Sequence, residues 1–181
     1  MSVESFKSAD RRQKGAGHPV MFGLPEAEYF GPFPDGGGYP IRFLHKAFQI
    51  MGVVDPQQVL HVCSGSMKIG IRVDIRPEMR PTIVADVRCL PFADNSFWWI
   101  MADPPYSREY AENLYGTGAA YPDPHRLAAE CLRVLRPGGF LGFMHHMVPK
   151  FSRPGRIFKV YTITQGPGYN VRAWTLFTKE A

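Results

Sequence analysis

The sequence predicts a single α/β domain built on a doubly wound, mostly parallel sheet with an antiparallel C-terminal hairpin. Short apolar runs separated by turn residues indicate buried parallel strands, at residues 59–63, 71–75, 82–85, 97–102 and 140–144. Apolar residues at helical spacing indicate two amphipathic helices, at residues 39–51 and 124–135. Alternating segments around Gly166-Pro167-Gly168 indicate a hairpin, at residues 156–165 and 169–179. Strands that alternate with crossovers and end in a hairpin are typical of doubly wound folds.

The ends of the two helices are marked by residues that stop a helix. Gly52 and Asp55-Pro56 close the first helix, and Arg136-Pro137-Gly138-Gly139 follows the second. In the strand at 97–102, Trp98 and Trp99 lie inside an apolar run, so we expect both indoles in the core.

The domain organisation follows from length and composition. A chain of 181 residues has room for one hydrophobic core, and too little for a separate recognition domain. Residues 1–38 are rich in Gly and Pro, so we expect an arm that drapes over the domain formed by residues 39–181.

The connections between the first three strands are short. Only residues 64–70 and 76–81 are left for two crossovers, whereas parallel neighbours normally need about a dozen residues or more. We therefore expect the helices between these strands to be shortened or absent, which would expose an apolar sheet face. The arm and the helix at 39–51, or a second copy of the chain, would then cover that face.

Positive charge is concentrated near the C-terminus. The formal net charge is +5, and from residue 147 onward six basic residues stand against one acidic residue, Glu180. The six are Lys150, Arg153, Arg156, Lys159, Arg172 and Lys179. Such a segment suits a polyanion such as nucleic acid, although a solvated surface without a partner explains the same charges.

Several classes of protein are disfavoured. Cys63, Cys89 and Cys131 lack C-x-x-C spacing, so neither a disulfide framework nor a metal site is expected. No stretch approaches the roughly 20 apolar residues of a membrane span, and the charged N-terminus is unlike a signal peptide. We therefore expect a cytoplasmic protein with no membrane partner.

Polar residues follow four of the predicted strands. In a doubly wound sheet, ligands lie at the carboxyl ends of the strands, so these residues are expected to line one cleft. They are Ser64-Gly65-Ser66, Asp74, Asp86 and Asp103.

In the order of these segments, residues 59–146 resemble the Rossmann-like, class I S-adenosylmethionine-dependent methyltransferases. The resemblance implies that Cys63, Ser64 and Gly65 form the loop beside the methionine portion of the cofactor. It also implies that Asp74 accepts hydrogen bonds from the ribose, and that Asp86 and Val87 hold the adenine. Asp103 would be a further cofactor-binding residue.

Asp103-Pro104-Pro105-Tyr106 resembles the signature of amino-methyltransferases, namely the DNA N6-adenine and N4-cytosine enzymes and some RNA guanine N2 enzymes. An exocyclic amino nitrogen donates its lone pair into the ring, so it is a poor nucleophile until its N–H bonds are held in a more tetrahedral geometry. The Asp103 carboxylate and the Pro104 carbonyl offer two acceptors, and the prolines fix φ. Tyr106 offers a ring on which a flipped base can stack.

The leading hypothesis is an enzyme that methylates a nucleobase amino group in nucleic acid, DNA more than RNA. A small-molecule methyltransferase is the second, and a non-catalytic nucleic-acid-binding module is the third. His145 and His146 follow a strand and either contact substrate or are structural. Specificity would come from the loop at 107–123, the basic hairpin or a partner.

Overall fold

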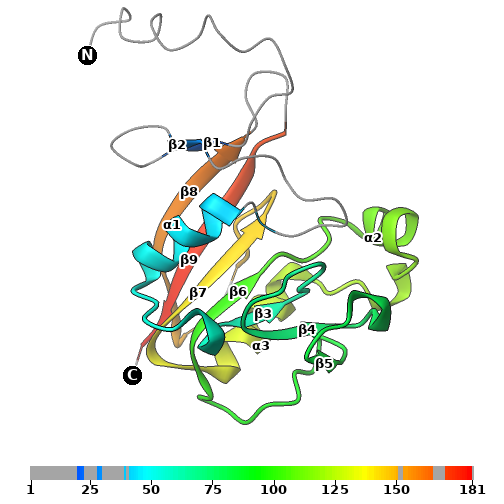
Figure 1. The fold of residues 1–181 in the computed structure, drawn as a ribbon, viewed down its shortest axis with the longest axis horizontal. Coiled ribbons are helices and arrows are strands. Elements are labelled where there is room, and N and C mark those ends of the chain that lie inside the picture. The colour runs from blue at the N-terminus through cyan, green and yellow to red at the C-terminus, as the bar shows by residue number, and fades with distance from the viewer. Residues whose placement is uncertain are drawn as a thin grey trace, which may run out of the picture.

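A nine-stranded sheet, with the order β2-β1-β8-β9-β7-β6-β3-β4-β5, forms the centre of the molecule (Figure 1). The computed structural model describes residues 20–22, 28–29, 39, 41–150, 153–164 and 170–180. The strands are β1 (Val20–Phe22), β2 (Glu28–Tyr29), β3 (Leu60–Val62), β4 (Ile71–Asp74), β5 (Ile83–Val84), β6 (Phe97–Ala102), β7 (Leu135–His145), β8 (Gly155–Thr164) and β9 (Arg172–Lys179).

The predicted fold class is confirmed. Strands β5, β4, β3, β6 and β7 pair in parallel in that order, while β9 is antiparallel to both β7 and β8. Because the chain enters β9 at the edge where the parallel strands end, Arg172 lies near the carboxyl end of β7. The register places Ala173 opposite His145.

The two short crossovers are present, without a full helix in either. The connection from β4 to β5 contains only the 3₁₀ turn η3 (Pro77–Met79). Parallel neighbours normally need a crossover of about a dozen residues, but a shorter one is enough here because the strands are short. The three residues of β3 span roughly 10 Å, which a loop of this length can retrace.

The two long helices cover opposite faces of the sheet (Figure 1). Helix α1 (Ile41–Met51) packs Phe43, Ala47 and Met51 into a core cluster with Met101 and Trp174. The other face is covered by helix α3 (Pro124–Val134), which packs Leu127, Ala128, Cys131 and Leu132 against β3, β4, β6 and β7. Burying apolar surface on both faces is the main stabilising contribution to such a layered domain.

The sheet face without crossover helices is more polar than expected. Ile71 and Val73 join the α3 cluster, so Arg72, between them in β4, points to the opposite face. There its guanidinium donates to the carbonyls of Met67 and Arg80. The prediction of an apolar face is therefore wrong at Arg72 in β4.

Part of the expected cover is present. In helix α1, the ring of Phe48 lies 6.3 Å from that of His61 in β3. The described part of the arm, β1 and β2, joins the sheet beyond β8 instead, at the opposite edge from β5. The rest of residues 1–38, apart from these strands, lies outside the described residues.

One helix was not predicted. Helix α2 (Arg108–Tyr115) lies within the segment expected to be a loop. Its N-terminus is capped by Ser107, whose hydroxyl accepts from the Tyr110 amide at 3.0 Å, and Gly116 ends it with a φ of 62°. Among the described residues, no helix has the length and hydropathy needed to cross a bilayer.

Candidate functional site

The loop after β3 has a backbone shape that suits close approach of a ligand. Cys63 and Gly65 both have positive φ, of 55° and 50°, and the Gly65 amide donates to Asp74 Oδ2 at 2.8 Å. Burial, reinforced by the negative charge of Asp74, raises the pKa of the Cys63 thiol. The Cys63 thiol therefore favours its protonated form.

Asp74 is buried at the end of β4, and its acceptor positions are well used. Oδ1 accepts from the amide and Nε of Arg76, at 3.0 and 3.1 Å. Oδ2 accepts from the Gly65 amide and, at 3.4 Å, from Arg76 Nη2. A carboxylate offers about four such positions. Ribose hydroxyls could bind Asp74 only if the Arg76 guanidinium turned away.

Asp86 and Val87 lie after β5, and they differ in what they can offer. Asp86 is held by Arg88, whose Nη2 donates to Oδ2 at 2.6 Å, and this hydrogen bond lowers the pKa of Asp86. The side chain of Val87 is buried in the α3 cluster. Only the backbone of Val87 can therefore face a ligand.

Asp103 stands at the carboxyl end of β6, next to the loop after β3. Its amide lies 3.4 Å from the carbonyl of Val62, and Tyr106 donates its hydroxyl to Oδ1 at 3.2 Å. Burial raises the pKa of Asp103 to about 6, against the opposing effects of Arg172 and of the Tyr106 hydrogen bond. The carboxyl group can therefore gain or lose a proton close to neutral pH.

The Tyr106 ring is surrounded by side chains from the ends of β7 and β9. His146 stacks on it at 4.1 Å between centroids, with 28° between the planes. The Arg172 guanidinium carbon lies 5.3 Å from the ring centroid. Since a flat imidazole already stacks on Tyr106, a flat ligand can do the same once the exposed His146 side chain turns aside.

His145 differs from its neighbour in being buried. Its Nδ1 accepts from the Met147 amide at 3.2 Å, which leaves the proton of a neutral ring on Nε2. Burial lowers the pKa of His145 to about 4. The ring therefore remains neutral at physiological pH, and it contacts Tyr106 edge-on at 5.4 Å.

Two buried hydroxyls beside the cleft lack a hydrogen-bond partner among the described residues. One is Ser64 Oγ, in the predicted cofactor loop, and the other is the phenol of Tyr39, which precedes α1. Burial, followed by the charge of Asp103, raises the pKa of Tyr39. Sequence reasoning missed Tyr39, because a tyrosine before an amphipathic helix looks like ordinary core.

The basic C-terminal segment does not form one face around the site. Arg172 contacts Tyr106, but Arg156 and Lys179 lie at the other end of the β8/β9 hairpin. Arg156 pairs with Glu180 at 3.6 Å, and Lys179 donates to Asn95 and to the carbonyls of Arg133 and Leu135. The described hairpin thus supplies one basic side chain to the cleft.

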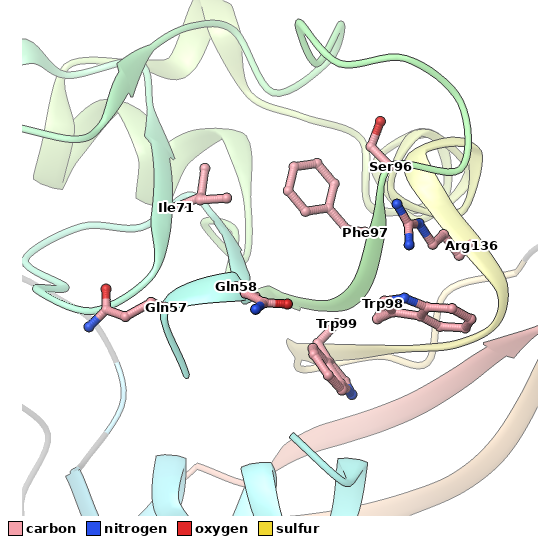
Figure 2. Close-up of a pocket in the computed structure, with 8 residues that line it drawn as sticks. All are labelled: Gln57, Gln58, Ile71, Ser96, Phe97, Trp98, Trp99 and Arg136. Atoms are coloured by element: carbon pink, nitrogen blue, oxygen red, sulfur yellow. The ribbon is translucent and has the colours of Figure 1, made fainter. Parts of the chain in front are cut away.

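A pocket of about 220 Å³ lies at the opposite, amino-terminal ends of the strands (Figure 2). Gln57 and Gln58 of η2 (Pro56–Gln58) and Arg136 line it, together with Trp98 and Trp99. Trp98 is 44% exposed, so its predicted place in the core is wrong. Trp99 is half-buried and donates to the Met51 carbonyl at 3.1 Å.

Solved structures share this fold at low sequence identity. TrmN from Thermus thermophilus matches with a TM-score of 0.56 and 16% identity, over 76% of this chain and 48% of that one. The methyltransferase in complex with the Trm112 methyltransferase activator of Haloferax volcanii matches with a TM-score of 0.55 and 15% identity, over 76% and 89%. YcgJ of Bacillus subtilis matches with a TM-score of 0.50 and 12% identity, over 76% and 98%.

The chain therefore spans about half of TrmN and most of the other two proteins. No curated protein matches the chain. The family described as "Methyltransferase domain" matches residues 36–143, which is more than half of the chain. In the structure, the ends of the strands meet around Asp103. The chain belongs to this methyltransferase family and is a class I, S-adenosylmethionine-dependent enzyme.

Proposed function

We propose that the enzyme methylates an exocyclic amino nitrogen of a nucleobase in DNA or RNA, and that Asp103-Pro104-Pro105-Tyr106 is its catalytic element. The observation that carries this proposal is the Asp103 carboxyl group. It has a pKa of about 6, lies beside the predicted cofactor loop and is in contact with an aromatic ring. An acceptor of this kind suits an amino group that must lose a proton during methylation.

The residues around the cleft fit the cofactor. S-adenosylmethionine, when bound, supplies an electrophilic methyl group on a sulfonium sulfur. The buried hydroxyls of Ser64 and Tyr39 would each gain a hydrogen-bond partner from it, and the Gly65 backbone allows close approach. Cys63 and the Val87 backbone are further parts of the proposed cofactor site, and Asp74 and Asp86 join it once the guanidinium groups of Arg76 and Arg88 turn aside.

The proposed catalytic role of Asp103 is to accept hydrogen bonds from the amino group, together with the Pro104 carbonyl. These acceptors hold the nitrogen so that its lone pair points at the methyl carbon. Bound S-adenosylmethionine would supply the methyl group to that nitrogen, and its sulfur would keep the electron pair of the broken carbon–sulfur bond. The amino nitrogen then gives up a proton, which Asp103 can take because its pKa is near neutral.

A small-molecule amine is the competing substrate class, and one observation favours it. Arg172 is the one basic side chain of the described hairpin that contacts Tyr106, whereas helix α2 bears the exposed acids Glu109 and Glu112. A substrate without phosphates would need no further cation there. The nucleobase remains the stronger proposal because of the aromatic surroundings of Asp103.

Incorporation of labelled methyl from S-adenosylmethionine separates the two classes. The purified enzyme is incubated with single-stranded and duplex DNA, with RNA, and with a metabolite extract. Label in a nucleic acid, identified after digestion as an N-methylated base, supports the proposal. Label confined to small molecules, or to ring carbons or ring nitrogens of the base, contradicts it.

A further inference from the structure

Helix α2 extends the aromatic surface of Tyr106 away from Asp103. The Tyr110 ring lies 5.7 Å from that of Tyr106, and the Tyr115 ring lies 6.1 Å from that of Tyr110. We name Tyr106, Tyr110 and Tyr115 the tyrosine row. The row starts in the cleft, because the Tyr106 hydroxyl donates to Asp103 Oδ1.

A guanidinium contacts each end of the tyrosine row. Arg172 lies over Tyr106 at 5.3 Å, and Arg76 lies over Tyr115 at 4.3 Å from the ring centroid. Arg76 also forms the ion pair with Asp74. The row therefore runs from the proposed catalytic carboxyl group to the proposed cofactor carboxylate.

The tyrosine row is open to a partner. Tyr110 is 39% exposed, and Tyr106 and Tyr115 are half-buried. Met147 and Val171, which flank the neighbouring ends of β7 and β9, are 42% and 56% exposed. Aromatic and apolar side chains gathered at a cleft mark a surface that binds flat, apolar ligand faces.

The charges around the row limit the form of the partner. Among the described residues, Arg76 and Arg172 are the cations that contact the row, and Arg76 already forms an ion pair with Asp74. Glu109 and Glu112 lie exposed on the same helix. A partner held mainly by phosphate contacts would find few cations here, whereas one held by stacking would not need them.

We propose that the tyrosine row binds unpaired bases next to the methylated base, so that the enzyme acts on single-stranded nucleic acid. In a duplex the faces of each base are covered by its neighbours, while an unpaired strand can lay its bases on aromatic rings. This inference rests on the proposed function, because it assigns a substrate form to the same cleft.

The expected changes in affinity follow from the free energy of base stacking and from the number of cations at the tyrosine row. Loss of one stacking ring lowers single-strand affinity by about 5- to 100-fold. With contacts to at most about two phosphates, log K should fall with log salt at a slope no steeper than about −1.4, well below that of a phosphate-driven binder.

The test measures fluorescence anisotropy of labelled oligonucleotides of about 12 nucleotides, as single-stranded DNA, single-stranded RNA and duplex. The full chain is used with S-adenosylhomocysteine present. Tyr110→Ala removes a ring of the row, and Tyr110→Phe keeps it. Phe158→Ala is the matched control, because Phe158 is an exposed aromatic residue on β8 that contacts Phe140 instead.

We expect the wild type, Tyr110→Phe and Phe158→Ala to bind a single strand alike and more tightly than the duplex, while Tyr110→Ala binds it 5- to 100-fold more weakly. The inference is overturned if the wild type binds duplex as tightly as a single strand. It is also overturned if Tyr110→Ala binds a single strand with the same affinity as Phe158→Ala. If nucleic acid is methylated but Tyr110 has no effect, the inference fails and the proposed function stands. If only small amines are methylated, the proposed function itself fails.

Discussion

The substitution Asp103→Asn tests the proposed catalytic group most directly, because it removes the charge and keeps the shape. Burial raises the pKa of Asp103 from the ordinary 3.8 to about 6. At 1.4 kcal/mol per pKa unit, the ionised carboxylate destabilises the folded state by at most about 3 kcal/mol above pH 6. The asparagine carbonyl can still accept the Tyr106 hydrogen bond. We therefore expect a more stable protein, with a melting temperature higher by up to about 10 °C.

The pH dependence of the gain in stability shows whether burial of the Asp103 carboxylate causes it. The folded protein holds the Asp103 proton up to about pH 6, whereas an unfolded chain loses it near 3.8. Wild-type stability therefore falls as the pH rises between these values, relative to the variant. Thermal unfolding at pH 4 and at pH 7.5 should show little gain at the lower pH and the full gain at the higher.

Activity should change in the opposite sense. Removing a preorganised polar group from a reacting centre lowers the rate by about 100-fold or more. Cofactor affinity should change little, which calorimetry would show. Glu78→Gln, which removes an exposed negative charge on η3, is the control for net charge. Methyl transfer by Asp103→Asn at a near wild-type rate refutes the catalytic role, and a stability gain that is equal at both pH values refutes the burial argument.

Three further predictions concern neighbouring groups. Arg172 opposes the rise in the pKa of Asp103, so Arg172→Gln should move the acid limb of the pH–rate profile to higher pH; an unmoved limb contradicts this. Tyr39→Phe removes a buried hydroxyl without a partner in the described structure. Calorimetry should show a cofactor affinity about 5- to 10-fold weaker, and thermal unfolding should show no loss of stability. An unchanged affinity excludes contact between the Tyr39 hydroxyl and the cofactor. Lys179→Met removes three hydrogen bonds at the end of α3. Thermal unfolding should therefore show a stability lower by about 1–3 kcal/mol, while oligonucleotide affinity should stay unchanged. Weaker binding of oligonucleotides would show that Lys179 contacts nucleic acid.

Most strands were predictable from the sequence, because their signal is local. The run 97–102 coincides with β6, since a buried strand needs apolar residues all along its length. Helix α2 was missed although its caps are plain in the sequence, with Ser107 before it and Gly116 after it. With 8 residues it is shorter than the stretch of about 11 residues or more over which helical periodicity can be recognised.

Side-chain contacts between segments far apart in the chain were not predictable. Trp98 was expected in the core, but the irregular pairing of β6 with β7 leaves it exposed beside Arg136. The ion pair between Asp86 and Arg88 was not foreseen either. A sequence shows which residues alternate along a strand, and it does not show which partner each side chain finds.

For the candidate site, the sequence by itself determined the position of the reactive groups along the chain. Asp103-Pro104-Pro105-Tyr106 follows an apolar run, and strand ends gather wherever parallel strands pair. Only the tertiary structure decided their chemistry. The pKa of Asp103 depends on burial and on Arg172, 69 residues away in the sequence. The same holds for the pKa of Tyr39, because burial and electrostatic coupling are set by distances in space.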